Sequence, residues 1–241
     1  MKLDILAIGV HPDDVELSCS GTLMKAMSEG KEVGILDLTR GELGTRGNME
    51  IRAKEAAHSA EIMGINTRHN AEMEDGFFAN DASHQLTVIQ YIRKFRPDII
   101  ICNAMDDRHP DHGRAAELVE VANFLAGLSK IITRGDDGLV QDEWRARLVL
   151  HYIQDRWLTP DIIIDISDFF DKKMASIMAY KSQFYNADVT NTEKETYISS
   201  PDFLDGIRIR SKELAKACNF TYAEGFTCKR FLGVKSISSL F

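Results

Sequence analysis

The sequence has no closely spaced cysteine pair, no long apolar run and no excess of basic residues. Its four cysteines show neither C-x-x-C spacing nor the spacing of a small disulfide scaffold, which favours a reducing compartment. No stretch approaches the roughly 18 apolar residues of a membrane span. The first residues lack the charged segment and cleavage site of a signal peptide. We therefore expect a cytoplasmic protein that does not contact a membrane.

The charge balance argues against nucleic acid as a partner. Acidic residues outnumber basic ones by 37 to 29, giving a net charge of −8, whereas phosphate binding requires a basic face. A small anionic substrate is still compatible with this balance, because two local arginines suffice to hold one. Hydrophobic residues make up 44% of the 241 positions, enough for a sizeable core. With no repeat or linker, residues 1–241 are expected to form a single domain.

Strand-like and helix-like segments alternate along the chain. Strands are predicted at residues 3–10, 32–39, 67–73, 98–103, 147–153 and 161–167, and helices at 19–30, 49–63, 84–95, 112–128, 168–184 and 201–217. This alternation predicts an α/β, Rossmann-like fold, with a mainly parallel sheet and helices on both faces. The segment 222–232 is ambiguous, and the polar stretch 186–200 is expected to be a mobile loop.

Two charged clusters follow predicted strands. HPDD, residues 11–14, comes after the first strand, and DDRHPDHG, residues 106–113, comes after the apolar strand 98–103. In open α/β sheets, ligands bind beyond the carboxyl ends of the strands. If the two strands are neighbours in the sheet, the two clusters face each other.

These clusters contain the ligands of a catalytic metal ion. Catalytic zinc takes three protein ligands from histidine and carboxylate and keeps one position for water. His11, Asp14 and His112 supply that set, and Zn2+ is the preferred ion. Two histidines and one carboxylate also suit Fe2+, so iron remains an alternative.

The neighbouring residues supply groups for catalysis. Asp13, left beside the metal without binding it, is a candidate general base for a water molecule. A protonated His109 would stabilise an oxyanion or donate to a leaving amine, and Asp111 would orient it.

Simpler interpretations exist for each motif. Adjacent aspartates after a strand often form a turn or a helix N-cap, and HPDH alone could be a solvated loop. Two such motifs, each directly after a predicted strand, are much less expected by chance. A two-metal phosphoesterase using Asp106 and Asp107, or a non-catalytic sugar- or metal-binding protein, are the rival functions. Asp13 speaks against the second rival, because binding alone needs no spare carboxylate.

A glycine-rich loop and the start of a helix follow the second strand. In LTRGELGTRGNMEIRAKEA, residues 38–56, glycines at 41, 44 and 47 allow the backbone to approach a ligand closely. Glu42, Arg46 and Arg52 are the candidate substrate-binding residues, and Arg52 is preferred because it opens a helix beside the same sheet edge.

Taken together, HPDD, the TRGELGTRG loop, the R-x-x-E of Arg52 and Glu55, and HPDHG resemble the PIG-L/LmbE-like zinc N-acetylglucosamine deacetylases. The resemblance covers most of the chain. YKSQFY at 180–185 and YAEGF at 222–226 are similar to the branch that deacetylates N-acetylglucosaminyl-malate in bacillithiol biosynthesis. Deacetylation of another N-acetylglucosamine derivative or of a chitooligosaccharide is the alternative.

The resemblance implies roles for the same residues. It implies zinc on His11, Asp14 and His112, Asp13 as the base, and His109 beside the oxyanion or leaving amine. It places Arg52 on the acidic aglycone, and it implies a homo-oligomer, with a hexamer as the expected size. Relatives in mycothiol synthesis often carry tyrosine where this chain has Asp107, so a mycothiol-type substrate is not expected.

Overall fold

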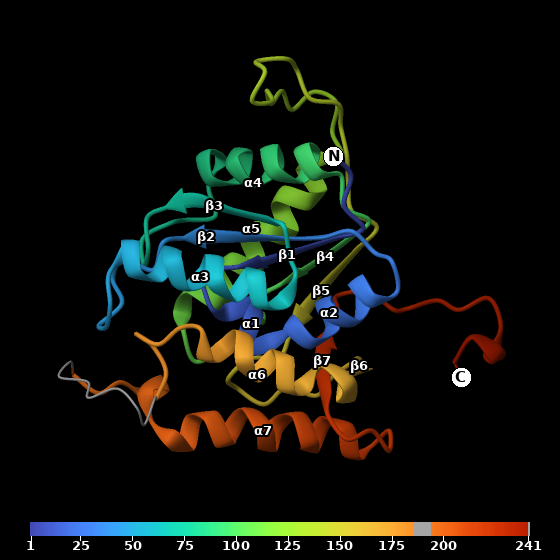
Figure 1. Cartoon of the computed structure of the whole chain (residues 1–241). Helices are drawn as coiled ribbons and strands as arrows, with labels where there is room; N and C mark the ends of the chain where they lie inside the picture. Colours follow the sequence, from blue (N-terminus) through green and yellow to red (C-terminus); the bar gives the residue numbers. More distant parts are fainter. Residues whose placement is uncertain (186–193, 241) are drawn as a thin grey trace.

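The structure is a computed structural model that describes residues 1–185 and 194–240, and it contains one seven-stranded sheet (Figure 1). The spatial order is β3-β2-β1-β4-β5-β7-β6, and all pairs from β3 to β5 are parallel. The strands are β1 Ile5–Gly9, β2 Val33–Thr39, β3 Thr67–Met73, β4 Ile99–Cys102, β5 Leu148–Tyr152, β6 Ile162–Asp165 and β7 Ala223–Thr227. The expected α/β fold with a mainly parallel sheet is confirmed.

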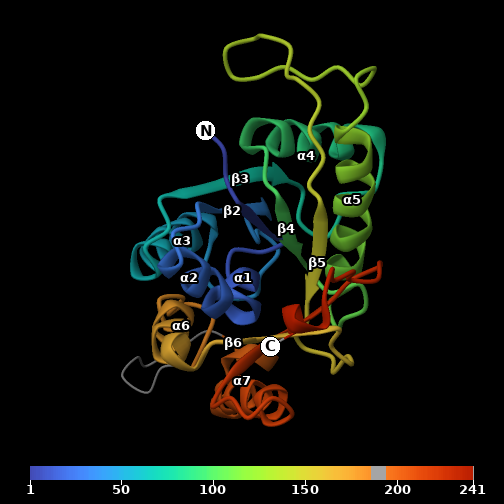
Figure 2. The ribbon, with the colours of Figure 1, turned by 90° about the vertical axis from the view of Figure 1, so that its right-hand side faces the viewer.

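Helices cover both faces of the sheet, as expected (Figure 2). They are α1 Asp14–Ser18, α2 Ser20–Ser28, α3 Met49–Met63, α4 Ala82–Phe95, α5 Pro110–Ala126, α6 Phe170–Met178 and α7 Pro201–Lys216. Alternate side chains of the central strands pack against α4 and α5 on one face and against α1, α2 and α3 on the other. Because both faces are covered, the central strands read as continuous apolar runs.

The strand order reverses between β1 and β4, which lie side by side. Ile5 of β1 pairs with Val33 of β2 on one side and with Ile99 of β4 on the other. Chain segments leaving β1 and β4 therefore diverge to opposite faces, which opens a crevice at their carboxyl ends. The two charged clusters follow these two strands, so the fold brings them together.

The helices differ from the sequence-based expectation in two places. The helix expected at 19–30 is present as α2, but a short helix that was not expected, α1, precedes it at Asp14–Ser18. The helix expected at 168–184 is a short 3-10 turn, Ser167–Phe169, followed by α6, which ends at Met178. Residues 180–184 turn away instead, because Tyr180 and Phe184 bury their rings in a cluster with Ile177 and Ile207.

The ambiguous segment 222–232 contributes β7, which lies antiparallel between β5 and β6. Glu224 of β7 is buried and accepts hydrogen bonds from the Gly21 and Thr22 amides at the start of α2. The Lys173 ammonium on α6 donates to the same carboxylate over 2.6 Å. β7 therefore ties the last third of the chain to the first helices.

Of the stretch 186–200, for which we expected a mobile loop, residues 186–193 lie outside the described residues. Residues 197–199 form a short 3-10 helix, Tyr197–Ser199. Within the described part of the chain, no helix is both long enough and apolar enough to cross a bilayer.

Candidate active site

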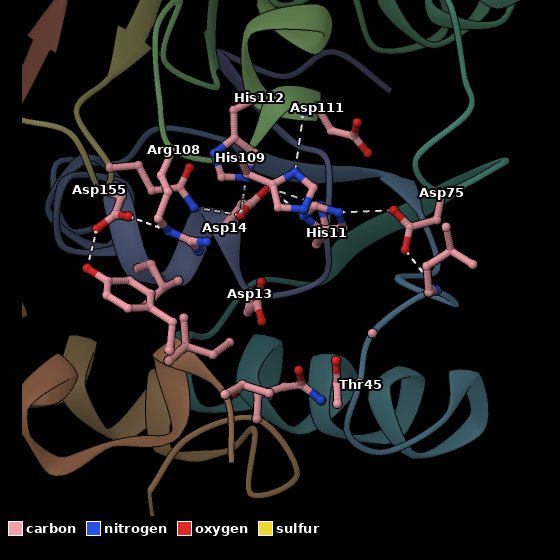
Figure 3. Close-up of a pocket in the computed structure, with 18 of the residues that line it drawn as sticks. His11, Asp13, Asp14, Thr45, Asp75, Arg108, His109, Asp111, His112 and Asp155 are labelled. Atoms are coloured by element: carbon pink, nitrogen blue, oxygen red, sulfur yellow. Dashed lines mark hydrogen bonds and ion pairs between the residues drawn. The ribbon is translucent and has the colours of Figure 1, made fainter. Parts of the chain in front are cut away.

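A pocket of about 480 Å³ opens at the carboxyl ends of β1 and β4. Its lining includes residues from both charged clusters, from the loop after β2 and from the segment after α6. Figure 3 shows His11, His109 and His112 gathered on one side, with Asp14 beside them and Asp13 facing the centre. The volume lies in the range of small-molecule sites.

The expected ligand set is assembled around one carboxylate. Asp14 Oδ1 lies 3.4 Å from His112 Nε2, and Asp14 Oδ2 lies 3.7 Å from His11 Nδ1. Burial alone would raise the pKa of Asp14, but the charge of His112 and the hydrogen bond to His11 hold it well below its usual range. An ionised carboxylate between two imidazole nitrogens is the donor set that a divalent transition metal prefers, so these residues fit the ion that the sequence implies.

The far nitrogen of each ring contacts a second carboxylate. Asp75 lies 3.1 Å from His11 Nε2, and Asp107 lies 2.5 Å from His112 Nδ1. Burial lowers the pKa of both histidines, yet the aspartates around them raise it to about 10 for His11 and about 9 for His112. A carboxylate on the outer nitrogen fixes the ring orientation and leaves the inner nitrogen for a metal.

Asp14 itself is held from three directions. Gln154, just after β5, donates to Oδ1 over 2.6 Å, and Asn103, just after β4, donates to Oδ2 over 3.0 Å. The backbone amides of Val10 and His11 also donate to Oδ2. The carboxylate orientation is therefore determined before any ion binds.

His109 is close enough to be an alternative third ligand. Nitrogen atoms of His11, His109 and His112 lie within 4.8 Å of one another. However, His109 Nδ1 accepts a hydrogen bond from the Asp111 amide, which leaves the proton of a neutral ring on Nε2. Burial and the two nearby histidines lower the pKa of His109, which favours this neutral form. The arrangement favours a neutral ring that donates from Nε2, and the protonated His109 expected from the sequence stays a prediction.

Asp13 lies in the pocket against Arg52. The Arg52 guanidinium donates to Asp13 Oδ2 over 3.0 Å and also to the carbonyls of Pro12 and Gly41. Burial raises the pKa of Asp13 to about 7, although the Arg52 charge acts in the opposite direction. A carboxylate with a pKa near neutrality is suited to accept and return a proton.

The backbone at Asp13 is strained. Its φ angle is 151°, in a region that favours glycine, and Arg52 holds the Pro12 carbonyl directly before it. Space for that arginine depends on Gly41, because a Cβ there would lie 1.9 Å from a guanidinium nitrogen. Arg52, expected on the substrate's acidic group, therefore makes its hydrogen bonds within the protein and positions Asp13.

Two other expected residues have different contacts. The Asp111 carboxylate binds the Gly76 amide and the Arg114 guanidinium, so only its backbone amide orients His109. Glu42 is exposed, does not line the pocket, and accepts a hydrogen bond from the Asp75 amide. Arg46 is buried and does line the pocket.

A second metal ion would need further open ligands. Asp107 is occupied by His112 and by the amides of Asp155 and Arg156, and Asp106 pairs with Arg156 at the surface. His11, Asp75 and Asp111 also cluster within 4.8 Å, but the oxygens of both aspartates already accept hydrogen bonds. Among the described residues the geometry therefore favours one ion over two.

Sequence reasoning missed four residues that support the donor set. Three of them, Asp75, Asn103 and Gln154, follow β3, β4 and β5 at the same end of the sheet. The fourth, Asp107, enters the sequence argument only as a second-metal ligand and as a departure from related sequences. Polar residues at successive strand ends are the signal that could have identified these positions.

Comparisons with known proteins identify the family of the chain. The family model described as PIG-L, GlcNAc-PI de-N-acetylase, matches residues 6–123. Diacetylchitobiose deacetylase of Thermococcus kodakarensis is 31% identical over 193 residues, covering 75% of this chain and 70% of the relative. A probable N-acetyl-alpha-D-glucosaminyl L-malate deacetylase 2 of Bacillus cereus is 26% identical over 206 residues, covering 76% and 84%.

Solved structures show the same fold over nearly the whole chain. The conserved protein TT1542 from Thermus thermophilus superposes with a TM-score of 0.85 at 34% identity, covering 97% of this chain and 98% of that one. Motifs, pocket and relatives thus converge on the same chemistry. The chain belongs to the PIG-L family, and it is an amide-hydrolysing deacetylase.

Proposed function

We propose that this enzyme removes the acetyl group of N-acetylglucosaminyl-malate, a step of bacillithiol biosynthesis, to give acetate and the free amine. The observation that carries the hydrolytic part is the position of Asp13, a buried carboxylate with a pKa of about 7 in the same pocket as His11, Asp14 and His112. A binding protein would have no use for such a carboxylate.

His11, Asp14 and His112 would hold the metal ion, with Zn2+ preferred and Fe2+ the alternative. When bound, such an ion lowers the pKa of water and polarises the acetyl carbonyl. Asp13 accepts the proton of the attacking water. His109, neutral and protonated on Nε2, donates a hydrogen bond to the developing oxyanion. The amine leaves with a proton from Asp13 or from His109.

A different pair of arginines supports the malate group. Because Arg52 is engaged with Asp13, the acidic aglycone needs another cation. Arg108 and Arg210 both line the pocket, and the Arg108 side chain is 47% exposed. Both approach the single carboxylate of Asp155, so two positive charges face one negative charge on this wall. That surplus favours an anionic group.

A second candidate substrate is N,N'-diacetylchitobiose, because the Thermococcus relative named for it is 31% identical. It carries no charge and would not need the arginine pair. We also infer a cytoplasmic homo-oligomer, and the family resemblance favours a hexamer. Light scattering of the purified protein measures that size.

The test is acetate release from N-acetylglucosaminyl-malate, free N-acetylglucosamine and N,N'-diacetylchitobiose, with metal content measured on the same sample. We expect preference for the malate conjugate, reduced selectively in Arg108→Ala. Arg52→Ala should instead lower turnover of every substrate, and Arg147→Ala, an exposed arginine at the other end of β5, is the matched control. Faster turnover of the chitobiose would reassign the aglycone, and no amide hydrolysis by the metal-loaded protein would reject the proposal.

A further inference from the structure

The turn after α6 places one amide side chain in the wall of the pocket. Gln183 lines the pocket, and it lies in the chain between two residues, Tyr180 and Phe184, whose rings are fully buried. The preceding Ser182 is fixed by Glu55 of α3, which accepts hydrogen bonds from the Ser182 amide and hydroxyl. The backbone carrying Gln183 is therefore held on both sides.

The hydrogen bonds of this turn determine which way the Gln183 amide faces. Its Nε2 lies 2.7 Å from the Arg46 carbonyl and 2.9 Å from Ser182 Oγ. The carbonyl is an acceptor, and the Ser182 hydroxyl already donates its hydrogen to Glu55 over 2.7 Å. Both neighbours therefore require the amide nitrogen, and the reversed orientation would bring oxygen against oxygen.

Turning Nε2 toward these neighbours leaves Gln183 Oε1 without a donor among residues 1–185 and 194–240. The atom is also not among the buried side-chain atoms that lack a partner. Gln183 lines the pocket and its Nε2 is held by Arg46 and Ser182, so we infer that Oε1 is the amide atom available to a ligand. A ligand that covered it without donating a hydrogen bond would leave a desolvated acceptor.

The place of this acceptor selects the part of the ligand that it meets. Figure 3 shows Thr45 across the pocket from His109 and His112, with Asp13 between them. Gln183 binds the carbonyl of Arg46, the residue next to Thr45. It therefore belongs to the wall opposite the hydrolytic groups, where the sugar ring would lie when the acetamide is at Asp13.

We propose that Gln183 is a specificity-determining residue whose Oε1 accepts a hydrogen bond from one ring hydroxyl of the amino sugar. The inference rests on the proposed function, because it requires an N-acetylated amino sugar in this pocket. It adds a substrate contact that neither the charged clusters nor the glycine-rich loop supplies. An analogue lacking that hydroxyl loses the donor, and its kcat/KM falls by about tenfold to a hundredfold.

The experiment compares the best N-acetylglucosamine substrate with its 3-, 4- and 6-deoxy analogues by acetate release. Wild type should lose about tenfold to a hundredfold in kcat/KM on one analogue. Methionine has a similar length to glutamine but no acceptor. In Gln183→Met, kcat/KM for the parent substrate should therefore fall by the same factor, and kcat/KM for the analogue should not fall below that of the parent. Gln90→Met, the same substitution at an exposed glutamine of α4 that does not line the pocket, is the control and should retain the discrimination.

Thermal unfolding and metal content establish that each variant is folded. If Gln183→Met is unstable, Gln183→Asn replaces it, because its shorter side chain withdraws the acceptor by one methylene. The inference is overturned if Gln183→Met still discriminates between the parent substrate and the deoxy analogue. Wild-type turnover of all three analogues at the rate of the parent also overturns it. If wild type releases no acetate from any N-acetylated amino sugar, the proposed function itself has failed.

Discussion

The Arg52 guanidinium lies 3.0 Å from the Asp13 carboxylate, and both side chains are buried. This pair joins the start of α3 to the strained turn after β1. It makes the arginine an electrostatic partner of the candidate base, so a change at Arg52 should alter the protonation of Asp13.

Replacing Arg52 should move the acid limb of the pH–activity profile. Burial raises the pKa of Asp13 to about 7 and the Arg52 charge lowers it, so Arg52→Met raises the pKa further. Since the base acts as a carboxylate, activity of the variant should rise at a higher pH than in wild type. kcat/KM measured across pH tests this, with exposed Arg40→Gln as the control. If the acid limb of the variant lies at the same pH as that of wild type, Arg52 does not act on Asp13.

Asp13→Asn should lower kcat by about 10²- to 10⁴-fold, the usual contribution of a general base. The amide keeps the size of the side chain but cannot accept the proton of water. Metal content should remain at one ion per chain, because Asp13 is outside the expected donor set. Steady-state kinetics with elemental analysis of the same sample measure both quantities. Full activity with one bound metal would end the assignment.

Asp107→Asn should weaken metal binding by about 10- to 100-fold, because the carboxylate fixes the orientation of His112. Competition with a chromogenic chelator measures the affinity without any substrate. The neighbouring Asp106→Asn is a matched control, since Asp106 pairs with Arg156 at the exposed surface. Equal affinities of the two variants would contradict the orienting role.

The stabilising contribution of His151 to the folded protein should be lost at alkaline pH. Burial lowers its pKa, but contacts with Cys102, Glu120 and the Asn103 carbonyl raise it to about 10. The pKa of His151 in the folded state exceeds its value of about 6.5 in the unfolded chain. Protonated His151 therefore contributes fully to the free energy of unfolding below about pH 6.5, and this contribution is lost as the pH rises toward 10. Urea unfolding should show the advantage of wild type over His151→Gln narrowing across that window. A constant difference would mean that the ring does not bind its extra proton in the folded state.

Strand ends could be predicted because they depend on local pattern. HPDD and HPDH follow apolar runs, and pairing of β1 with β4 then brings them together. Spacing alone does not determine the direction of a long side chain, so the sequence favours the substrate as the partner of Arg52, although its guanidinium contacts Asp13. The same limit applies to the Asp111 carboxylate, which contacts Arg114. The β7 segment AEGFT is ambiguous in sequence because its pairing with β5 and β6 depends on partners distant along the chain.

The pairing of β1 with β4 links formation of the metal site to folding. His11 and Asp14 follow β1, whereas His112 opens α5 after β4, so the donor set exists only once these two strands have paired. A metal ion that binds this set binds the native state and not the unfolded chain. It would stabilise the protein by about 4 kcal/mol at a free concentration a thousand times its Kd. Metal supply would thus set how long the chain resists unfolding and proteolysis, independently of turnover.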